Sequence, residues 1–210
     1  GDCLEVLKTL SDACVDAVVC DPPAAIGFMN KSWDDDKGGR DSWVAWLASI
    51  MRECLRVLKP GGHAFVWTLP RIVGWTHRAV EDAGFEIREC CAHIFASGFP
   101  KSQSISKAID KMYGAEREVI GNNPNARPAQ KDYSLDGKSA NFQANYNPIT
   151  APATPAAAKW EGFGTALKPA YEFWILARKE VAEKTIAGNV LKYGTGAINI
   201  DACRVATADN

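Results

Sequence analysis

The sequence lacks any apolar run long enough to cross a bilayer, and its first residues show no signal-peptide pattern. These two absences argue against a membrane-spanning or secreted class of protein. We therefore expect a soluble protein of the cytoplasm.

A large charge of either sign is also missing, because 24 basic and 25 acidic residues give a net charge of −1 at pH 7. This balance excludes a uniformly basic nucleic-acid binder, so any contact with DNA must come from local clusters of Lys and Arg. The length of 210 residues and the hydrophobic content of 47% suffice for one domain with a sizeable core and an insertion.

Metal-ligand spacings are absent as well. The seven cysteines form no Cys-x-x-Cys pair, and the three histidines have no ligand spacing between them. We interpret the cysteines as buried, reduced thiols and the histidines as structural or surface residues, and we expect no metal site.

The sequence does contain a short, nearly all-apolar run, Val15–Cys20, followed directly by Asp21-Pro22-Pro23. Such a run is typical of a strand that is buried on both faces of a parallel sheet. The two prolines fix φ and remove two backbone donors, so the chain must leave the sheet after Asp21. The Asp21 carboxylate is thereby held at the carboxyl edge of the sheet, where ligands bind in open α/β folds.

This arrangement suits the activation of an exocyclic amino group on a nucleobase, which is a poor nucleophile because its lone pair is delocalised into the ring. If the Asp21 carboxylate and the Pro22 carbonyl each accept one N–H, the nitrogen is drawn toward tetrahedral geometry and its lone pair points at an electrophile. The alternative is that Asp-Pro-Pro is only a turn that ends a strand.

An apolar strand followed by Asp-Pro-Pro resembles the catalytic motif of the DNA amino-methyltransferases, in particular their phage and restriction-modification members. The resemblance covers nearly the whole chain, through residues 1–4, 58–62, 97–102 and 167–169. It implies a Rossmann-like α/β fold, with a mostly parallel sheet that has an antiparallel hairpin at its edge.

The same resemblance implies that Asp21, Pro22 and Pro23 are catalytic, that S-adenosyl-L-methionine donates the methyl group, and that double-stranded DNA is the partner. It implies the cytoplasm of a bacterial or phage-infected cell. It leaves the oligomeric state open, a homodimer included.

The chain departs from the family pattern at the fourth motif position, where Ala24 stands in place of the usual aromatic residue and cannot stack on a flipped base. Phe28 or Trp33 can supply the missing ring, so both are candidate base-stacking residues. The alternative is an inactive nucleic-acid-binding remnant.

Hydrophobic spacing predicts the other elements in chain order. We expect helices over about 4–10, 42–58, 73–83, 105–113 and 184–193, and strands over 64–67, 85–96 and 171–177. Asp41 or Ser42 should cap the second of these helices, and Pro-Gly-Gly at 60–62 should end it. The last two strands should pair antiparallel as a hairpin.

Two further expectations concern the edge of the sheet. A right-handed crossover between the first two strands should bring Asp21 and the stretch 68–70 to the same carboxyl edge. The charged loop at 34–40 is interpreted as solvated.

Residues 97–170 are rich in Pro, Asn, Ala and Ser, and they separate a catalytic half at 1–96 from a return strand and carboxyl-terminal segment at 171–210. This insertion has nine basic and six acidic residues, so its net charge is +3 and that of the remainder is −4. A positive insertion that carries aromatic residues suits DNA recognition, with Lys101, Lys107 and Lys111 as candidate DNA contacts. The alternative is a flexible surface loop without a partner.

Two features concern the methyl donor. In the resembling family an acidic residue at the position of Asp2 can contact the adenosyl group, although Asp is also an ordinary helix N-cap. The glycine-rich donor motifs of the family, Phe-x-Gly-x-Gly or Asp-Pro-Phe-x-Gly, are absent from the sequence. In the permuted class these motifs lie downstream, and the chain begins without methionine, so we expect a fragment that lacks its donor-binding half.

The favoured function is site-specific methylation of adenine N6, because a Ser in place of Asp21 is the commoner cytosine N4 form in the family. Methylation of cytosine N4, of RNA or of a protein glutamine remains open, as does the inactive remnant. The expected reaction flips the base out of the duplex and needs neither a covalent enzyme intermediate nor a metal.

Overall fold

The computed structural model describes residues 1–28, 31–96, 98, 102–123 and 148–205. The chain divides into two compact units. Gly1–Ala96 together with Ala170–Asn210 form the first, here named the sheet unit, and Ser97–Pro169 form the second, here named the insert unit.

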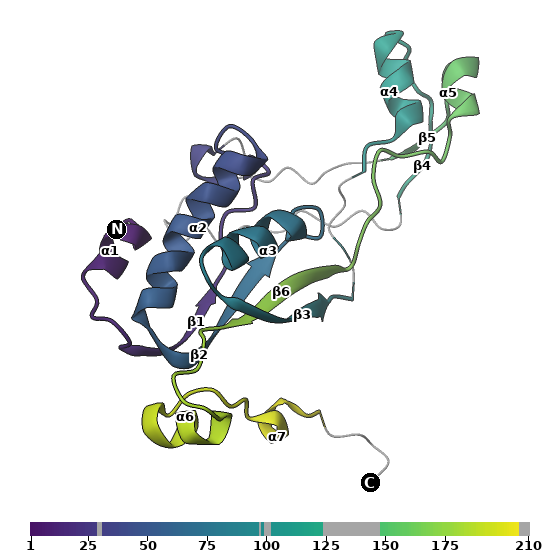
Figure 1. Ribbon diagram of the computed structural model, residues 1–210. Coiled ribbons are helices and arrows are strands. Elements are labelled where there is room, and N and C mark those ends of the chain that lie inside the picture. Colours follow the sequence, from purple (N-terminus) through teal and green to yellow (C-terminus); the bar gives the residue numbers. More distant parts are fainter. Residues whose placement is uncertain (29–30, 97, 99–101, 124–147, 206–210) are drawn as a thin grey trace, which may run out of the picture. The chain divides into compact units, whose positions relative to one another are not determined.

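The sheet unit is built on a four-stranded sheet with the order β1-β2-β6-β3. Its strands are β1 (Val15–Cys20), β2 (Leu58–Thr68), β3 (Glu86–Ile94) and β6 (Tyr171–Arg178). β1 is parallel to β2, and β6 is antiparallel to both β2 and β3, so three strands run one way and β6 runs against them (Figure 1). The mostly parallel α/β sheet and its antiparallel β3–β6 hairpin are confirmed, with β6 inside the sheet and β3 at its edge.

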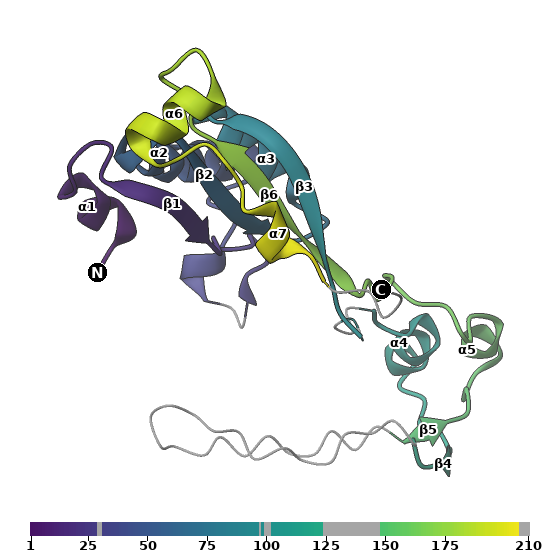
Figure 2. The same ribbon diagram turned by 90° about the horizontal axis from the view of Figure 1, so that it is seen from below.

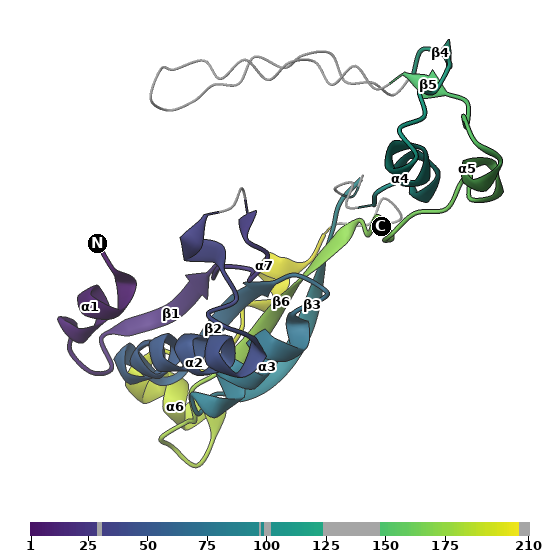
Figure 3. The same cartoon turned by 90° about the horizontal axis from the view of Figure 1, so that it is seen from above.

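Helices lie on both sides of this sheet. Seen from above, α2 (Arg40–Val57) and α3 (Val73–Asp82) cover one face (Figure 3). α6 (Ile186–Tyr193) and α7 (Ile200–Cys203) lie on the other side (Figure 2), and α1 (Cys3–Lys8) packs against α2. No helix among the described residues is both long and apolar enough to cross a bilayer.

The core lies between the sheet and the pair α2 and α3. Trp43, Leu47 and Met51 of α2 are buried there together with Val66 of β2 and Ile175 of β6. Burial of such large apolar side chains is the main favourable term in folding, so this layer fixes the position of the strands.

The expectation that the first strand is buried on both faces is wrong. Val18 and Cys20 pack against the core, but Val19 is 70% exposed. β1 has a single neighbour in the described sheet, and α2 and α3 cover only the face on which Val18 and Cys20 lie. The apolar run therefore marks one buried face and one open face.

Two expectations about the next helix are also wrong. α2 begins after Gly39, with no side-chain cap from Asp41 or Ser42, and it ends at Val57 before the Pro-Gly-Gly segment. That segment instead belongs to β2.

Close packing against Asn189 of α6 explains Gly61 of β2. The Pro60 carbonyl accepts hydrogen bonds from Asn189 Nδ2 at 2.8 Å and from Thr195 Oγ1 at 2.6 Å. A Cβ atom on Gly61 would lie 2.6 Å from Asn189 Nδ2, so only glycine allows this contact.

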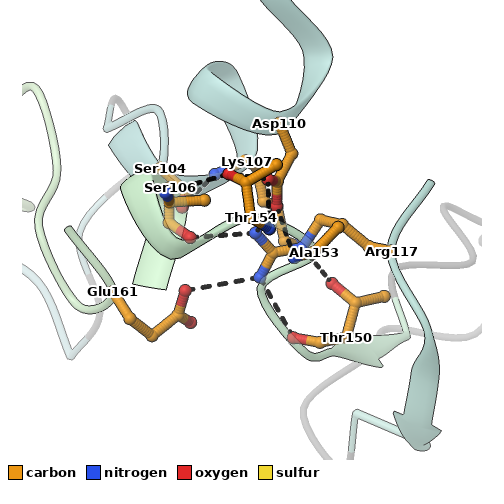
Figure 4. Close-up of polar contacts among 10 residues, drawn as sticks. Ser104, Ser106, Lys107, Asp110, Arg117, Thr150, Ala153, Thr154 and Glu161 are labelled. Carbon is orange, nitrogen blue, oxygen red and sulfur yellow. Dashed lines mark hydrogen bonds and ion pairs between the residues drawn. The ribbon is translucent and has the colours of Figure 1, made fainter. Parts of the chain in front are cut away.

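The insert unit contains α4 (Ile105–Met112), β4 (Val119–Gly121), β5 (Ile149–Thr150) and α5 (Pro155–Lys159). Arg117 lies at its centre, where it donates to Asp110 Oδ2 at 2.7 Å, to Ser106 Oγ at 2.9 Å and to Thr150 Oγ1 at 2.9 Å (Figure 4). Asp110 is only 1% exposed and also accepts from the Thr154 hydroxyl at 2.8 Å.

Burial alone raises the pKa of Asp110, but the hydrogen bonds from Ala153, Thr154 and Arg117 outweigh it and hold the pKa below its ordinary value. The ion pair thus joins α4, β5 and the start of α5. It supplies internal order in a unit where, among the described residues, Ala157 is the only fully buried apolar residue.

Candidate active site

Asp21 stands at the carboxyl edge of the sheet, directly after β1. Cys20 is paired with Val66, so Asp21 lies beside the end of β2, where Thr68, Leu69 and Pro70 follow. The expectation that these stretches share one edge is confirmed. Neither the Asp21 carboxylate nor the Pro22 carbonyl accepts a hydrogen bond from any residue that the structure describes.

The charge of Asp21 is affected by its surroundings. Partial burial raises the pKa of the Asp21 carboxyl above its ordinary value, and the nearby Glu172 carboxylate raises it further. Glu172, on β6, accepts a hydrogen bond from the Trp67 indole N–H at 2.8 Å. Two carboxylates and one indole ring therefore lie together at the carboxyl ends of β1 and β2 and the amino end of β6.

The loop after Asp-Pro-Pro is held by the buried side chain of Asp34. Its Oδ1 accepts from the Ala24 N–H at 2.5 Å and its Oδ2 from the Phe28 N–H at 2.8 Å, while its backbone oxygen accepts from Gly27 N–H at 2.7 Å. Asp34 is 1% exposed, so the expectation that the whole charged loop is solvated is wrong for this residue.

Backbone geometry explains why this loop needs such an anchor. Pro22 and Pro23 have no N–H and cannot form ladder hydrogen bonds, and Ala25 has a φ of +54°, which is unfavourable for a residue with a Cβ atom. The Asp34 carboxylate stabilises this loop because it accepts from the N–H groups of Ala24 and Phe28, which lie outside the strands.

The three positions considered for base stacking differ in exposure. Ala24 is buried at 7% and belongs to the core, whereas Phe28 is 50% exposed and Trp33 is 56% exposed. Position 24 therefore points into the protein, and the two loop aromatics point toward solvent.

The remaining candidate residues lie elsewhere. Asp2 caps α1, because its Oδ1 accepts from the Leu4 N–H at 2.9 Å and from the Glu5 N–H at 3.3 Å. Lys107 and Lys111 are exposed on α4 of the insert unit, and Lys101 lies outside the described residues.

No cluster that fits a metal occurs among the described residues, since none holds three or more His, Cys, Asp or Glu side chains together. The interpretation of the cysteines as buried is largely wrong. Cys54 is buried and Cys20 half-buried, but the other five are exposed. Burial raises the pKa of the Cys20 thiol to about 12, which keeps that thiol protonated and unreactive.

Comparison with known proteins gives a family. A family model described as DNA methylase, N6_N4_Mtase, matches residues 15–193. The chain is 38% identical over 74 residues to the type II methyltransferase M.BamHI of Bacillus amyloliquefaciens, a match that covers 34% of this chain and 17% of that protein. It is 23% identical over 113 residues to the type II methyltransferase M.HpaI of Haemophilus parainfluenzae, with 53% and 36% covered.

Among solved structures, the PvuII DNA methyltransferase (cytosine-N4-specific) is similar with a TM-score of 0.45 and 14% sequence identity, over 100% of this chain and 57% of that one. The chain thus spans 17% and 36% of the two curated relatives and about half of this structure.

We predict that Asp34→Ala lowers the free energy of unfolding by about 2 to 4 kcal/mol, because it leaves the Ala24 and Phe28 N–H groups without an acceptor in a buried site. Urea unfolding measures this loss. The matched control is Asp36→Ala, which removes an exposed carboxylate from the same loop and should cost less than about 1 kcal/mol. Equal losses in the two variants would refute the anchoring role.

We also predict that the pKa of Asp21 is higher than that of an ordinary aspartate and that Glu172→Gln lowers it. Removal of the neighbouring negative charge makes the ionised form of Asp21 less unfavourable. Carboxyl ¹³C NMR during a pH titration measures the shift. Glu89→Gln, an exposed change on β3, should leave the titration of Asp21 where it is.

Proposed function

The chain belongs to the N6/N4 DNA methylase family, and from that premise we propose that it forms the base-activating part of an S-adenosylmethionine-dependent DNA methyltransferase, with adenine N6 as the preferred acceptor. The observation that supports this proposal is the rigid edge at Asp21-Pro22, where two oxygen acceptors have no partner among the described residues. Family membership alone does not specify the base, so the preference for adenine rests on the Asp-Pro-Pro motif.

In the proposed reaction the residues at this edge bind and orient the amino group. One N–H donates to the Asp21 carboxylate and the other to the Pro22 carbonyl, so the nitrogen lone pair leaves the plane of the base. Proline suits the second position because its ring restricts the backbone that carries this carbonyl, and Asp34 restricts it further from the other end of the loop.

When bound, S-adenosylmethionine supplies an electrophilic methyl group on a sulfonium. As the amino nitrogen gains a bond to the methyl carbon, the carbon–sulfur bond would break and S-adenosylhomocysteine would leave with the electron pair on sulfur. The nitrogen must then lose one proton, which the Asp21 carboxylate can receive. A pKa raised by burial and by Glu172 favours this proton transfer over that of an ordinary aspartate.

Asp2 is the residue that we propose to contact the donor. One of its oxygens is engaged in the cap of α1, and Oδ2 has no partner among the described residues, so it can accept from an amino or hydroxyl group of the adenosyl moiety. The carboxylate thus fits a polar contact to the donor without loss of the cap.

The direct test is incubation of unmethylated genomic DNA with S-adenosylmethionine and the protein that the complete gene encodes, followed by mass spectrometry of the hydrolysed nucleosides. We expect N6-methyldeoxyadenosine rather than N4-methyldeoxycytidine. We predict that Asp21→Ala lowers the rate on the order of a hundredfold or more, because one fixed acceptor is lost, and leaves DNA affinity within a few-fold.

Three outcomes would each contradict a part of the proposed function. Turnover of Asp21→Ala near that of the wild type would refute the assignment of Asp21. Dominant N4-methyldeoxycytidine would replace the adenine preference with cytosine. DNA binding without any methylated nucleoside in the wild type would favour the binding remnant that Ala24 suggests.

We propose that the insert unit provides the contacts to DNA phosphates. We predict that replacing Lys101, Lys107 and Lys111 by Gln weakens DNA binding and flattens its salt dependence, by a slope of roughly 0.9 for each phosphate that is no longer neutralised. Fluorescence anisotropy over a series of salt concentrations measures both. Lys8→Gln on α1 removes the same kind of charge from the sheet unit and should leave the slope unchanged. If the triple variant also leaves the slope unchanged, the insert unit does not contact phosphate through these residues.

A further inference from the structure

The register of the sheet places three residues on one face at its carboxyl edge. Cys20 is paired with Val66, which is fully buried in the core, so alternation along the strands directs Asp21 and Trp67 toward the opposite face. The half-buried Trp67 ring also packs partly against the core. Trp67 is paired with Trp174 of β6, and Glu172 lies two residues before Trp174 on the same face. Figure 2 shows the sheet unit from this side.

Trp67 differs from its aromatic neighbours on this face. Phe65 and Trp174 stack on each other, with centroids 5.0 Å apart and planes 16° apart, whereas Trp67 stacks on no ring among the described residues. Its indole N–H is bound to Glu172 Oε2 at 2.8 Å, and its side chain is half-buried. The ring is therefore fixed at one edge, and its only polar atom is already engaged.

We propose that Trp67 is the aromatic surface on which the target base stacks while Asp21 holds its amino group, and that Glu172 is a positioning residue that fixes the indole. This inference rests on the proposed function and adds a substrate-contacting residue to it. It explains how a ring can reach the base although position 24 carries a buried alanine.

Charge at this edge indicates which part of DNA it can accept. Asp21 and Glu172 both carry carboxylates, which repel phosphate and attract N–H donors. A base with an exocyclic amino group offers such donors together with a flat ring, and an aromatic side chain binds that ring by stacking. A base therefore fits this edge better than the sugar–phosphate backbone does.

The first experiment compares variants of the protein that the complete gene encodes, in methyl transfer to unmethylated genomic DNA and in DNA affinity. We predict that Trp67→Leu lowers the rate about tenfold or more, whereas Trp67→Phe, which keeps a ring, retains most of it. Trp75→Leu is the matched control, because Trp75 is equally half-buried but lies on α3, against Trp43 on the core side. Circular dichroism melting of each variant monitors folding.

Two substitutions of Glu172 distinguish its effect on the orientation of the indole ring from the effect of its charge. Glu172→Gln keeps an acceptor for the indole N–H but removes the charge that further raises the pKa of Asp21, so it should lower the rate less than Glu172→Ala does. Glu172→Ala also frees the ring and should lower the rate at least as much as Trp67→Leu. Equal rates in Trp67→Leu and Trp75→Leu, relative to their melting temperatures, would overturn the proposal. So would a loss confined to Phe28→Ala or Trp33→Ala, which would return the stacking role to the loop.

The second experiment needs no methyl transfer. Indole N–H signals of ¹⁵N-tryptophan-labelled chain are recorded while deoxyadenosine is added, and Trp67→Phe identifies the Trp67 signal. We expect a selective shift of that signal, with the Trp75 signal unchanged. If the shift occurs but DNA is not methylated, stacking stands and the proposed reaction fails. If DNA is methylated but the Trp67 signal does not move up to the solubility limit of the nucleoside, the reaction stands and the role of Trp67 is refuted.

Discussion

The pairing of β2 with a neighbour on each side is the constraint on which the sheet unit depends. β2 is parallel to β1 and antiparallel to β6, so its end fixes where both neighbours present their side chains. Trp67 lies between Asp21 and Glu172 for this reason alone. At the other end of the strand, the Pro60 carbonyl accepts from Asn189 and Thr195 and ties α6 to the same strand. A change of register by one residue would turn Trp67 toward the core and separate the three edge groups.

A second constraint comes from the two prolines. They end β1 without leaving any N–H at Pro22 or Pro23, and the backbone that follows has to find acceptors outside the sheet. The buried Asp34 side chain is that acceptor. It accepts from Ala24 and Phe28 in the same way that a carboxylate accepts at the start of a helix, and it converts a strained turn into a fixed one. The rigid backbone at Pro22 that the proposed chemistry needs thus has two sources, which are the proline rings themselves and the side chain of Asp34, ten residues after Ala24.

Local physics explains which parts of this fold are visible in the sequence. The bounds of β1 and the break after it follow from β-branched residues and from proline, and the bounds of α3 and α4 follow from helical spacing, so all four are predicted within about two residues. The burial of Asp34 is not visible, because it lies in a run of three aspartates whose other members are exposed. The bond between Trp67 and Glu172 joins residues 105 positions apart, and only the register of β2 with β6 brings them together.

The uneven distribution of charge along the chain affects how the proposed site at Asp21 can bind DNA. Outside residues 97–170 the net charge is −4, and the edge itself carries two carboxylates, so this part of the chain repels a polyanion. Residues 97–170 carry +3, and their central ion pair between Arg117 and Asp110 is buried. The described lysines of this segment, rather than that arginine, therefore face solvent. In the proposed function, long-range attraction to phosphate and short-range attraction to an N–H donor therefore reside in different segments. The proposed site gains from this separation. If the contacts to phosphate were made at the edge of the sheet, the phosphates beside a base held by Asp21, Pro22 and Trp67 would be repelled by the Asp21 and Glu172 carboxylates.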